Sequence, residues 1–358
     1  MTKFRKIGVL TSGGDAPGMN ACVKAVVSKA HSLGIEVVGV VGGYAGLIKG
    51  EFTNLTYEKI SNAIGAGGTM LYSSRCPEFK TEEGMAAAVA SCHREGIDAL
   101  ICIGGDGTFR GATDMTLRGI PSIGLPGTID NDITATDYTI GLDTSINTVV
   151  EMVDCLRDTC ESHARLNVVE VMGRDCGQIA LYAAIATGAV AVAVPEVPFD
   201  EAGAIAHIKD LREKGKRGMI VIVSEGMKNA DGSAYGETLA KRIEAETGVE
   251  TKFARLAHVV RGGRPTAKDR TTASEMAVKA VELLTEGKSN LVMCQLDGKF
   301  VPVDISWALI ADRMYKNKLK PGDLDKFTPE QIEAMKALTA KRVAEVQKLY
   351  KIATDVSF

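Results

Sequence analysis

Two short acidic loops carry the side chains best suited to chemistry. Residues 104–108 read GGDGT, with Asp106 among glycines, and residues 126–132 read PGTIDND, with Asp130 and Asp132 on either side of an asparagine. A tight loop needs glycine or proline but does not need these carboxylates. Mg²⁺ commonly takes one or two carboxylates together with phosphate oxygens and water, and a carboxylate can accept the proton of an attacking hydroxyl group. The loops therefore indicate phosphoryl transfer.

The three carboxylates are predicted to have different roles. Asp106 is the predicted magnesium ligand, because a carboxylate beside a phosphate is repelled unless a divalent cation lies between them. Asp130 is the predicted general base, since an aspartate with a reference pKa near about 4 is ionised at neutral pH. Thr128 and Asp132 are assigned to orient the base or the substrate. The alternatives are a helix-capping Asp106 and a PGTIDND turn with a purely structural role.

A third loop, TSGGDAPGMN at residues 11–20, joins a predicted first strand to a predicted first helix. Glycines at Gly13 and Gly14 would let the backbone approach a phosphate, whose charge free N–H groups and the helix dipole stabilise. The same glycines would also fit a simple tight turn. The loop is neither a P-loop nor a dinucleotide fingerprint, so alone it does not decide between these interpretations.

Basic and polar side chains lie at the ends of several other predicted strands. A single arginine in such a place is usually a solvated surface charge, but several in one chain with two Gly-Asp loops suggest planar donors for phosphates and for transition-state charge. Glu225 offers acceptors that suit a polyol such as a sugar. His258 fits either a core histidine or a sugar-phosphate ligand beside one of these arginines. The four arginines are Arg75, Arg165, Arg174 and Arg261.

Composition indicates a folded globular protein with room for two domains. The 358 residues are 45% hydrophobic and 24% charged, and the net charge of −3 gives no electrostatic footprint for nucleic acid or an anionic membrane. The eight cysteines form no C-x-x-C pair, which favours reduced thiols in a cytoplasmic protein. The uncharged stretch at 176–195 has the length of a membrane span, but Gly188 divides it into a predicted buried helix and strand.

Short β-branched runs that end in Gly or Asp alternate with amphipathic stretches from KIGVLTSGGD at the start to RLAHVVRGG at 255–263. This β-α-β alternation predicts an α/β fold of two doubly wound three-layer α/β/α domains, each with a mainly parallel sheet. Ligand sites then belong at the carboxyl ends of the strands. Residues 321–358 form a predicted C-terminal helical extension, which begins with a capping-box pattern at Thr328 and Gln331.

The combination of motifs resembles the bacterial ATP-dependent 6-phosphofructokinase family. TSGGDAPGMN, GGDGT, PGTIDND, VVEVMGR, SEG and RGG occur in the family's order, and the resemblance covers residues 5 to about 305. It implies transfer of the ATP γ-phosphoryl group to the 1-hydroxyl of fructose 6-phosphate in glycolysis, with Mg²⁺ required. A lipid or NAD kinase would explain GGDGT but not PGTIDND followed by MGR. A non-catalytic regulatory subunit would be expected to lack Asp106 or Asp130.

The resemblance also implies site residues, domains and assembly. ATP is expected at Gly13, Arg75, Cys76, Gly105, Asp106, Gly107 and Thr108. Fructose 6-phosphate is expected at Thr128, Ile129, Asp130, Met172, Gly173, Arg174, Glu225, His258 and Arg261, with Arg174 stabilising the transferring group and His258 and Arg261 holding the 6-phosphate. Arg165 and Lys252 would reach in from a neighbouring subunit, so a homo-oligomer, usually a tetramer, is implied. The expected ATP domain is 1–141 plus about 259–305, and the expected sugar domain is 142–258 plus about 306–320.

Departures from the family pattern affect substrate affinity and regulation. Lys252 stands where the family has arginine and loses the bidentate fork, which Arg255 is one candidate to replace. Gly107 and Gly127 leave room for ATP where pyrophosphate-using relatives carry an acidic residue and a lysine. In the family's effector site, Ser28, Tyr57 and Val190 replace two cations and an acid, so altered allosteric control is expected. The matching effector-site residues are Lys24, Arg157, Lys214, Lys216 and Arg217.

Overall fold

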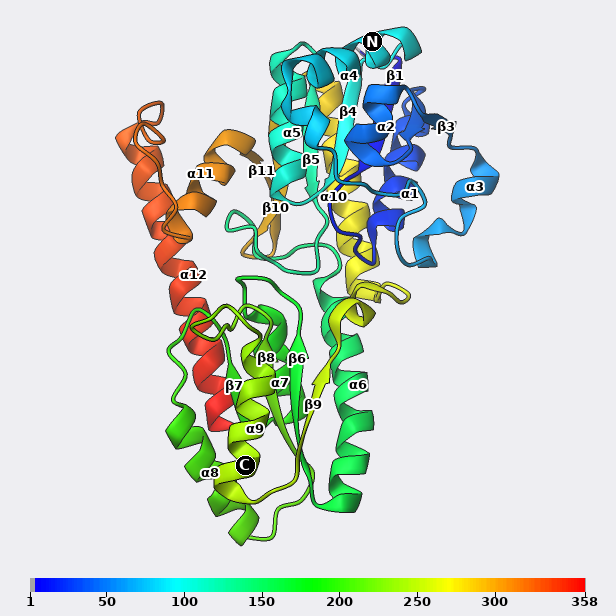
Figure 1. Ribbon diagram of the computed structural model, residues 1–358. Helices are drawn as coiled ribbons and strands as arrows, with labels where there is room; N and C mark the ends of the chain where they lie inside the picture. Colours follow the sequence, from blue (N-terminus) through cyan, green and yellow to red (C-terminus); the bar gives the residue numbers. More distant parts are fainter. Residues whose placement is uncertain (1–3, 358) are drawn as a thin grey trace. The chain divides into compact units, whose positions relative to one another are not determined.

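The computed structural model describes residues 4–357 and divides into two compact units. The first unit contains residues up to Ile129, Ile133–Asp143 and Arg261–Thr339, and the second contains Asp130–Asp132, Thr144–Val260 and the residues from Ala340 onward. Each unit is an α/β sandwich, as the β-α-β alternation predicts (Figure 1). The predicted fold class is therefore confirmed.

The first unit is built on a seven-stranded sheet in the order β11-β10-β5-β4-β1-β2-β3. Its five central strands are parallel, and only the edge strands β3 and β11 run antiparallel to their neighbours. The strands are β1 (Lys6–Thr11), β2 (Glu36–Val40), β3 (Phe52–Asn54), β4 (Ala99–Gly104), β5 (Ser122–Pro126), β10 (Leu291–Leu296) and β11 (Lys299–Asp304).

Helices cover both faces of this sheet. A pair of helices, α1 and α10, packs together, and α2, α4, α5 and α11 enclose the buried cluster on the other face, which includes Phe109. The short helices α3 and η1 lie beside α1, and η2 lies beside α4. The bounds are α1 (Met19–Ser32), α2 (Gly43–Lys49), α3 (Tyr57–Ser61), η1 (Ala63–Gly65), η2 (Pro77–Lys80), α4 (Glu82–Glu95), α5 (Asp106–Leu117), α10 (Ala267–Thr285) and α11 (Ile305–Tyr315).

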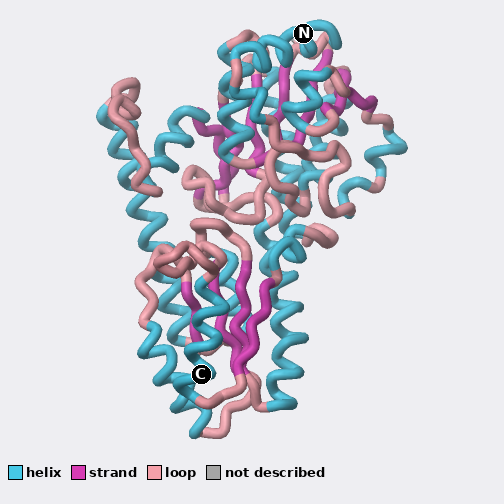
Figure 2. The backbone as a smooth tube through the Cα atoms, viewed as in Figure 1, coloured by secondary structure: helices cyan, strands magenta, loops and turns pink. Residues whose placement is uncertain are grey.

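The second unit has an all-parallel four-stranded sheet in the order β7-β8-β6-β9 (Figure 2). β6 and β8 are buried at every position, which is expected where helices cover both faces of a parallel sheet. The elements are α6 (Leu142–His163), β6 (Leu166–Val171), α7 (Gln178–Thr187), β7 (Ala191–Ala193), α8 (Glu201–Glu213), β8 (Met219–Ser224), α9 (Tyr235–Thr247), β9 (Thr251–Arg255) and η3 (Ala257–Arg261).

The uncharged stretch at 176–195 forms α7 and β7, separated by Gly188 with a positive φ of 59°. This confirms the helix-to-strand interpretation. No helix within residues 4–357 has both the length and the apolar character needed to cross a membrane. All eight cysteines are free thiols.

The C-terminal extension forms the long helix α12 (Pro329–Asp355). Its predicted capping box is present, since the Thr328 backbone N–H donates to Gln331 Oε1 at 2.9 Å and the Gln331 N–H donates to Thr328 Oγ1 at 3.3 Å. Val346 and Ala353 are buried, and His207 Nε2 of α8 lies 2.6 Å from the carbonyl oxygen of Ser357, just beyond the helix. The end of the extension is therefore docked on the second unit.

Two expectations about chain organisation differ from the structure. Residues 306–320 were expected in the sugar domain, but α11 belongs to the first unit because Ile305 and Ala308 join the core beside α5. The segment RLAHVVRGG was expected to be a strand. β9 instead ends at Arg255, and a positive φ of 47° at Ala257 turns the chain into the 3₁₀ helix η3.

A buried carboxylate fixes the loop that follows PGTIDND. Asp269 of α10 is fully buried and accepts hydrogen bonds from Tyr138 Oη at 2.6 Å and the Gly141 N–H at 2.7 Å. Burial and, next, the Asp269 carboxylate raise the pKa of Tyr138. A buried carboxylate must receive donors to offset its desolvation, so this contact couples the loop to the first unit's core.

Replacing Tyr138 by phenylalanine should therefore destabilise the protein. Tyr138→Phe removes a donor from the buried Asp269 and should lower the free energy of unfolding by about 1–3 kcal/mol, measured by chemical denaturation. Tyr57→Phe is the matched control, because Tyr57 is 81% exposed and its loss should change little. Equal stability of Tyr138→Phe and the wild type would contradict this role for the contact.

Candidate active site

The first unit brings two glycine loops together at the carboxyl edge of its sheet. β1 and β4 are adjacent parallel strands with Thr11 paired to Ile103, so the loops that follow them meet. Thr108 Oγ1 in the second loop donates to the carbonyl of Ser12 in the first at 3.2 Å. Gly13 has a positive φ of 87°, which glycine adopts without strain. This edge is a suitable cradle for phosphates.

A third segment of the first unit is attached to the same edge. Ser73 Oγ donates to the carbonyl oxygen of Gly13 at 2.5 Å, which fixes the chain just before Arg75 and Cys76. Arg75 is exposed, so its guanidinium can reach a bound anion. The structure therefore places the predicted ATP residues of these segments around one loop.

Asp106 is the first residue of α5 and is separated from β4 only by the N-cap residue Gly105. A helix N-terminus offers unpaired backbone N–H groups and favours anions. A Cβ placed on Gly105 or Gly107 would meet no atom within 4 Å, so both positions border open space. Within residues 4–357, no three His, Cys, Asp or Glu side chains group to hold a metal. One carboxylate facing phosphate oxygens and water is a donor set that Mg²⁺ accepts.

The PGTIDND loop holds its central carboxylate inside the second unit. The Asp130 side chain is 1% exposed, and its Oδ2 lies 3.1 Å from Arg174 Nε. Asp132 Oδ2 lies 4.0 Å from Arg174 Nη1. The arginine side chain itself is 61% exposed. The buried predicted base is thus paired with a cation that remains largely in solvent.

The loop that carries Arg174 follows β6 and has unusual backbone geometry. Gly173 has a φ of 138° and Arg174 a φ of 53°. A Cβ on Gly173 would approach the carbonyl oxygen of Cys176 to 2.4 Å, so glycine is required there. Glu225 Oε1 accepts hydrogen bonds from the N–H groups of Gly173 at 3.2 Å and Arg174 at 3.0 Å. Glu225 therefore holds the loop, a role that its sequence context did not indicate.

Arg165 and Lys252 lie at the end of the second unit's sheet that is opposite the Arg174 loop. Arg165 precedes β6, and Lys252 is the second residue of β9. Both form ion pairs with Glu250, with Arg165 Nε at 2.6 Å and Lys252 Nζ at 2.9 Å from its carboxylate oxygens. The hydrogen bond from Lys252, followed by that from Arg165, lowers the pKa of Glu250. These two cations are consequently not gathered with Arg174 within one chain. Arg255 pairs with Glu170 at 2.6 Å instead of joining them.

His258 and Arg261 are both in η3 but differ in their surroundings. His258 is exposed, so it is not a core histidine. Arg261 Nη1 donates to the carbonyl oxygen of Asp15 at 3.3 Å, and a Cβ on Gly14 would come within 2.6 Å of this nitrogen. Arg261 thus lies against the first glycine loop, a contact that the sequence did not indicate.

The predicted effector residues of the second unit form a basic surface at the end of α6 and the loop after α8. Arg157 donates to the carbonyl of Gly218 at 3.2 Å, and Arg217 Nε donates to that of Glu161 at 2.8 Å. Burial, followed by the charge of Arg157, lowers the pKa of Lys216. Lys214 pairs with Asp210 in α8, and Lys24 lies on α1 in the first unit. Val190 is 2% exposed, and its apolar side chain offers no polar group to an effector.

Glu196 is a further charged group near the Arg174 loop that sequence reasoning missed. Its Oε1 accepts the Gly177 N–H at 2.7 Å, at the N-terminus of α7, and burial raises its pKa. Its Oε2 is buried, and no described residue donates a hydrogen bond to it. The only available sequence signal was a glutamate directly after the predicted strand AVAVAVP.

Comparison with known proteins identifies the family of the chain. The sequence model described as phosphofructokinase matches residues 6–284, from β1 to the last turn of α10. The chain belongs to the phosphofructokinase family. This range includes every predicted catalytic and substrate-binding residue of both units.

Relatives of known description in this family cover most of the chain. ATP-dependent 6-phosphofructokinase 1 of Clostridium perfringens is 50% identical over 316 residues, which are 88% of this chain and 97% of the relative. The Bacillus subtilis ATP-dependent 6-phosphofructokinase is 49% identical over 302 residues, 84% of this chain and 93% of the relative. The structure of phosphofructokinase from Saccharomyces cerevisiae matches with a TM-score of 0.81 and 33% identity over 95% of this chain, which spans 50% of the yeast chain.

The raised pKa of Glu196 has a consequence for stability. A carboxyl group whose folded pKa exceeds its ordinary value, 4.5 for Glu196, stabilises the fold at low pH, and this stabilisation is lost as pH rises through the folded pKa. Glutamine does not titrate, so Glu196→Gln removes this pH dependence. The free energy of unfolding of the variant, relative to that of the wild type, should therefore increase between pH 4 and pH 8, by about 1.4 kcal/mol for each unit by which the pKa of Glu196 is raised. Urea unfolding across this range measures it. A difference that does not change with pH would contradict the assignment.

Proposed function

We propose that this chain transfers the γ-phosphoryl group of ATP to the 1-hydroxyl of fructose 6-phosphate, giving fructose 1,6-bisphosphate and ADP in cytoplasmic glycolysis. The observation that carries the proposal is the Asp130–Arg174 pair in the second unit, 3.1 Å apart, in a family whose named relatives are ATP-dependent 6-phosphofructokinases. The phosphate cradle around Gly13 and Thr108 supports a nucleotide substrate.

Asp130 acts as the general base. As the sugar O1 attacks the γ-phosphorus, the hydroxyl proton passes to an Asp130 carboxylate oxygen, the O1–P bond forms, and the bond to the β,γ-bridging oxygen breaks with its electron pair leaving on ADP. Arg174 is exposed enough to turn toward the transferring group and balance its equatorial charge. Thr128 and Asp132 orient the base or the sugar hydroxyl.

Asp106 is assigned to Mg²⁺, which when bound neutralises charge on the β- and γ-phosphates. Gly13, Arg75, Cys76, Gly105, Gly107 and Thr108 are assigned to ATP. The open space beside Gly107 supports the ATP assignment, because it leaves room for the nucleotide. An acidic side chain at this position would instead repel the nucleotide's phosphates.

The sugar phosphate is assigned to several groups of the chain. Thr128, Ile129, Met172, Gly173 and Glu225 face the sugar, while His258 and Arg261 hold its 6-phosphate. Arg165 and Lys252 serve the site of a neighbouring subunit in a homo-oligomer, a tetramer by family analogy. Lys24, Arg157, Lys214, Lys216 and Arg217 form an altered effector site, in which buried Val190 cannot assist a bound anion.

The general-base assignment predicts a specific loss of turnover. Asp130→Asn keeps the shape of the side chain but removes the proton acceptor, so kcat should fall by about 10²–10⁴-fold. ATP affinity, measured by calorimetry, should change little. Asp132→Asn in the same loop is the matched control and should lose less. Wild-type kcat in Asp130→Asn would end the assignment.

Lys252 provides a test of sugar-phosphate recognition. Lys252→Arg restores a planar fork that can bind phosphate in a bidentate manner, so the KM for fructose 6-phosphate should fall by about two- to tenfold, the size of a modest charge-assisted contact. Lys241→Arg is the control, because Lys241 is an exposed lysine paired with Glu237 on α9. An unchanged or raised KM in Lys252→Arg would refute the role.

A further inference from the structure

Asn131 links the predicted base to its neighbours through an uncommon backbone conformation. The residue is 6% exposed and has a φ of 50°, in the left-handed region that asparagine tolerates better than most side chains. The torsions of Asn131 set the direction in which the chain leaves Asp130. Any drift in Asn131 would therefore move the carboxylate that precedes it.

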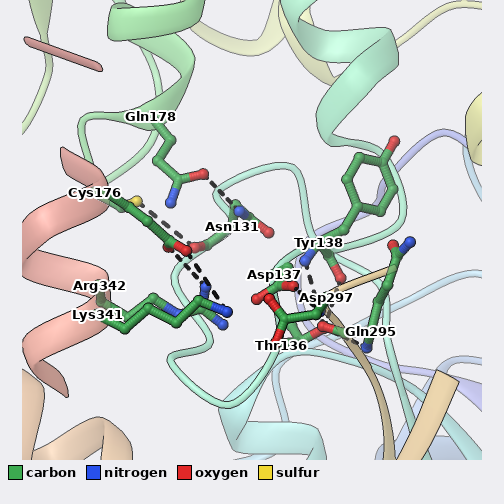
Figure 3. Close-up of polar contacts among 11 residues, drawn as sticks. Asn131, Thr136, Asp137, Tyr138, Cys176, Gln178, Gln295, Asp297, Lys341 and Arg342 are labelled. Carbon is green, nitrogen blue, oxygen red and sulfur yellow. Dashed lines mark hydrogen bonds and ion pairs between the residues drawn. The ribbon is translucent and has the colours of Figure 1, made fainter. Parts of the chain in front are cut away.

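The start of α7 holds Asn131 at two points. Asn131 Nδ2 donates to Gln178 Oε1 at 2.6 Å, and Cys176 Sγ donates to the carbonyl oxygen of Asn131 at 3.7 Å. Figure 3 shows the Asn131 amide directed toward the Gln178 side chain, with Cys176 beside the same residue. The side chain and the backbone of Asn131 are thus both attached to the same short segment.

That segment is itself hydrogen-bonded and closely packed. The Gly177 N–H is bound by Glu196 Oε1 at 2.7 Å, and a Cβ on Gly177 would meet Val194 at 2.5 Å, so the chain packs tightly there. Burial raises the pKa of the Cys176 thiol, which therefore stays protonated and able to donate. The anchor of Asn131 is consequently a fixed part of the second unit.

We propose that Gln178 is a positioning residue, which holds Asn131 in its left-handed conformation and thereby aims the Asp130 carboxylate. The inference rests on the proposed role of Asp130 as general base. Gln178 does not touch a reacting atom in this scheme. Its effect is on turnover, because catalytic groups must be held within a fraction of an ångström of the productive geometry.

The test removes each half of the contact separately. Gln178→Met keeps the length of the side chain without the acceptor, and Asn131→Gly keeps access to positive φ without the donor. Each should lower kcat about tenfold to a hundredfold, with the KM for ATP and the thermal unfolding temperature nearly unchanged. In the double variant, kcat should fall no further than in the worse single variant, because both changes break the same contact.

Rescue separates positioning from simple packing. Gln178→Glu retains an oxygen that accepts from Asn131, so its kcat should exceed that of Gln178→Met. Its added negative charge should move the acid limb of the kcat pH profile upward, because a nearby anion disfavours ionisation of the base. Asn131→Ala loses both the amide and the tolerance for positive φ, so it should be the slowest of the series.

The proposal is overturned if Gln178→Met has wild-type kcat and pH profile, or if the double variant loses the product of the two single effects. These outcomes differ from a failure of the proposed function. Full activity in Asp130→Asn would refute the general base, whereas an inactive Asp130→Asn with a fully active Gln178→Met would refute the positioning role alone. If Gln178→Met does not fold, judged by circular dichroism, Asn131→Gly and Gln178→Glu decide the question.

Discussion

Burying the Asp130 carboxylate is the constraint on which the second unit's site depends. Moving an ionised carboxylate out of water is costly unless a cation and hydrogen-bond donors replace the solvent. Arg174 supplies the cation from a side chain that is still mostly exposed. A fully buried ion pair would be rigid, whereas an exposed arginine can change partners when another anion arrives. The pair therefore combines a buried carboxylate, the proposed general base, with a largely exposed positive charge.

This arrangement explains the strained loop after β6. Arg174 has a positive φ of 53°, which costs free energy in a residue other than glycine. Glu225 offsets this cost by accepting two backbone hydrogen bonds from the loop, at Gly173 and Arg174. Asn131, the residue that follows Asp130, also has a positive φ of 50°. Strain on both sides of the Asp130–Arg174 pair is maintained by side chains of the same unit.

The sequence predicted what depends on local pattern. β-branched runs with glycine or aspartate at their ends became parallel strands with loops at one edge, because buried strands and ligand loops impose those residue types. The sequence did not predict contacts that depend on tertiary packing, such as the hydrogen bonds between Glu225 and the Arg174 loop or that between Arg261 and Asp15. RLAHVVRGG was misread because its alternation resembles a strand, while the positive φ at Ala257 that ends β9 is decided by surrounding structure.

Sheet geometry separates Arg165 from Arg174 within one chain. Arg165 and Arg174 lie at opposite ends of β6, a six-residue strand, and a strand rises about 3.3 Å per residue. A sugar phosphate cannot bind both arginines of one chain across roughly 20 Å. Arg165 and Lys252 are nevertheless held together on one exposed carboxylate, Glu250, which keeps two cations close without neutralising both. If Arg165 and Lys252 serve a neighbouring subunit, as proposed, a second chain that presents its own Asp130–Arg174 pair to this cluster would complete the phosphate site, and substrate affinity would be coupled to subunit association.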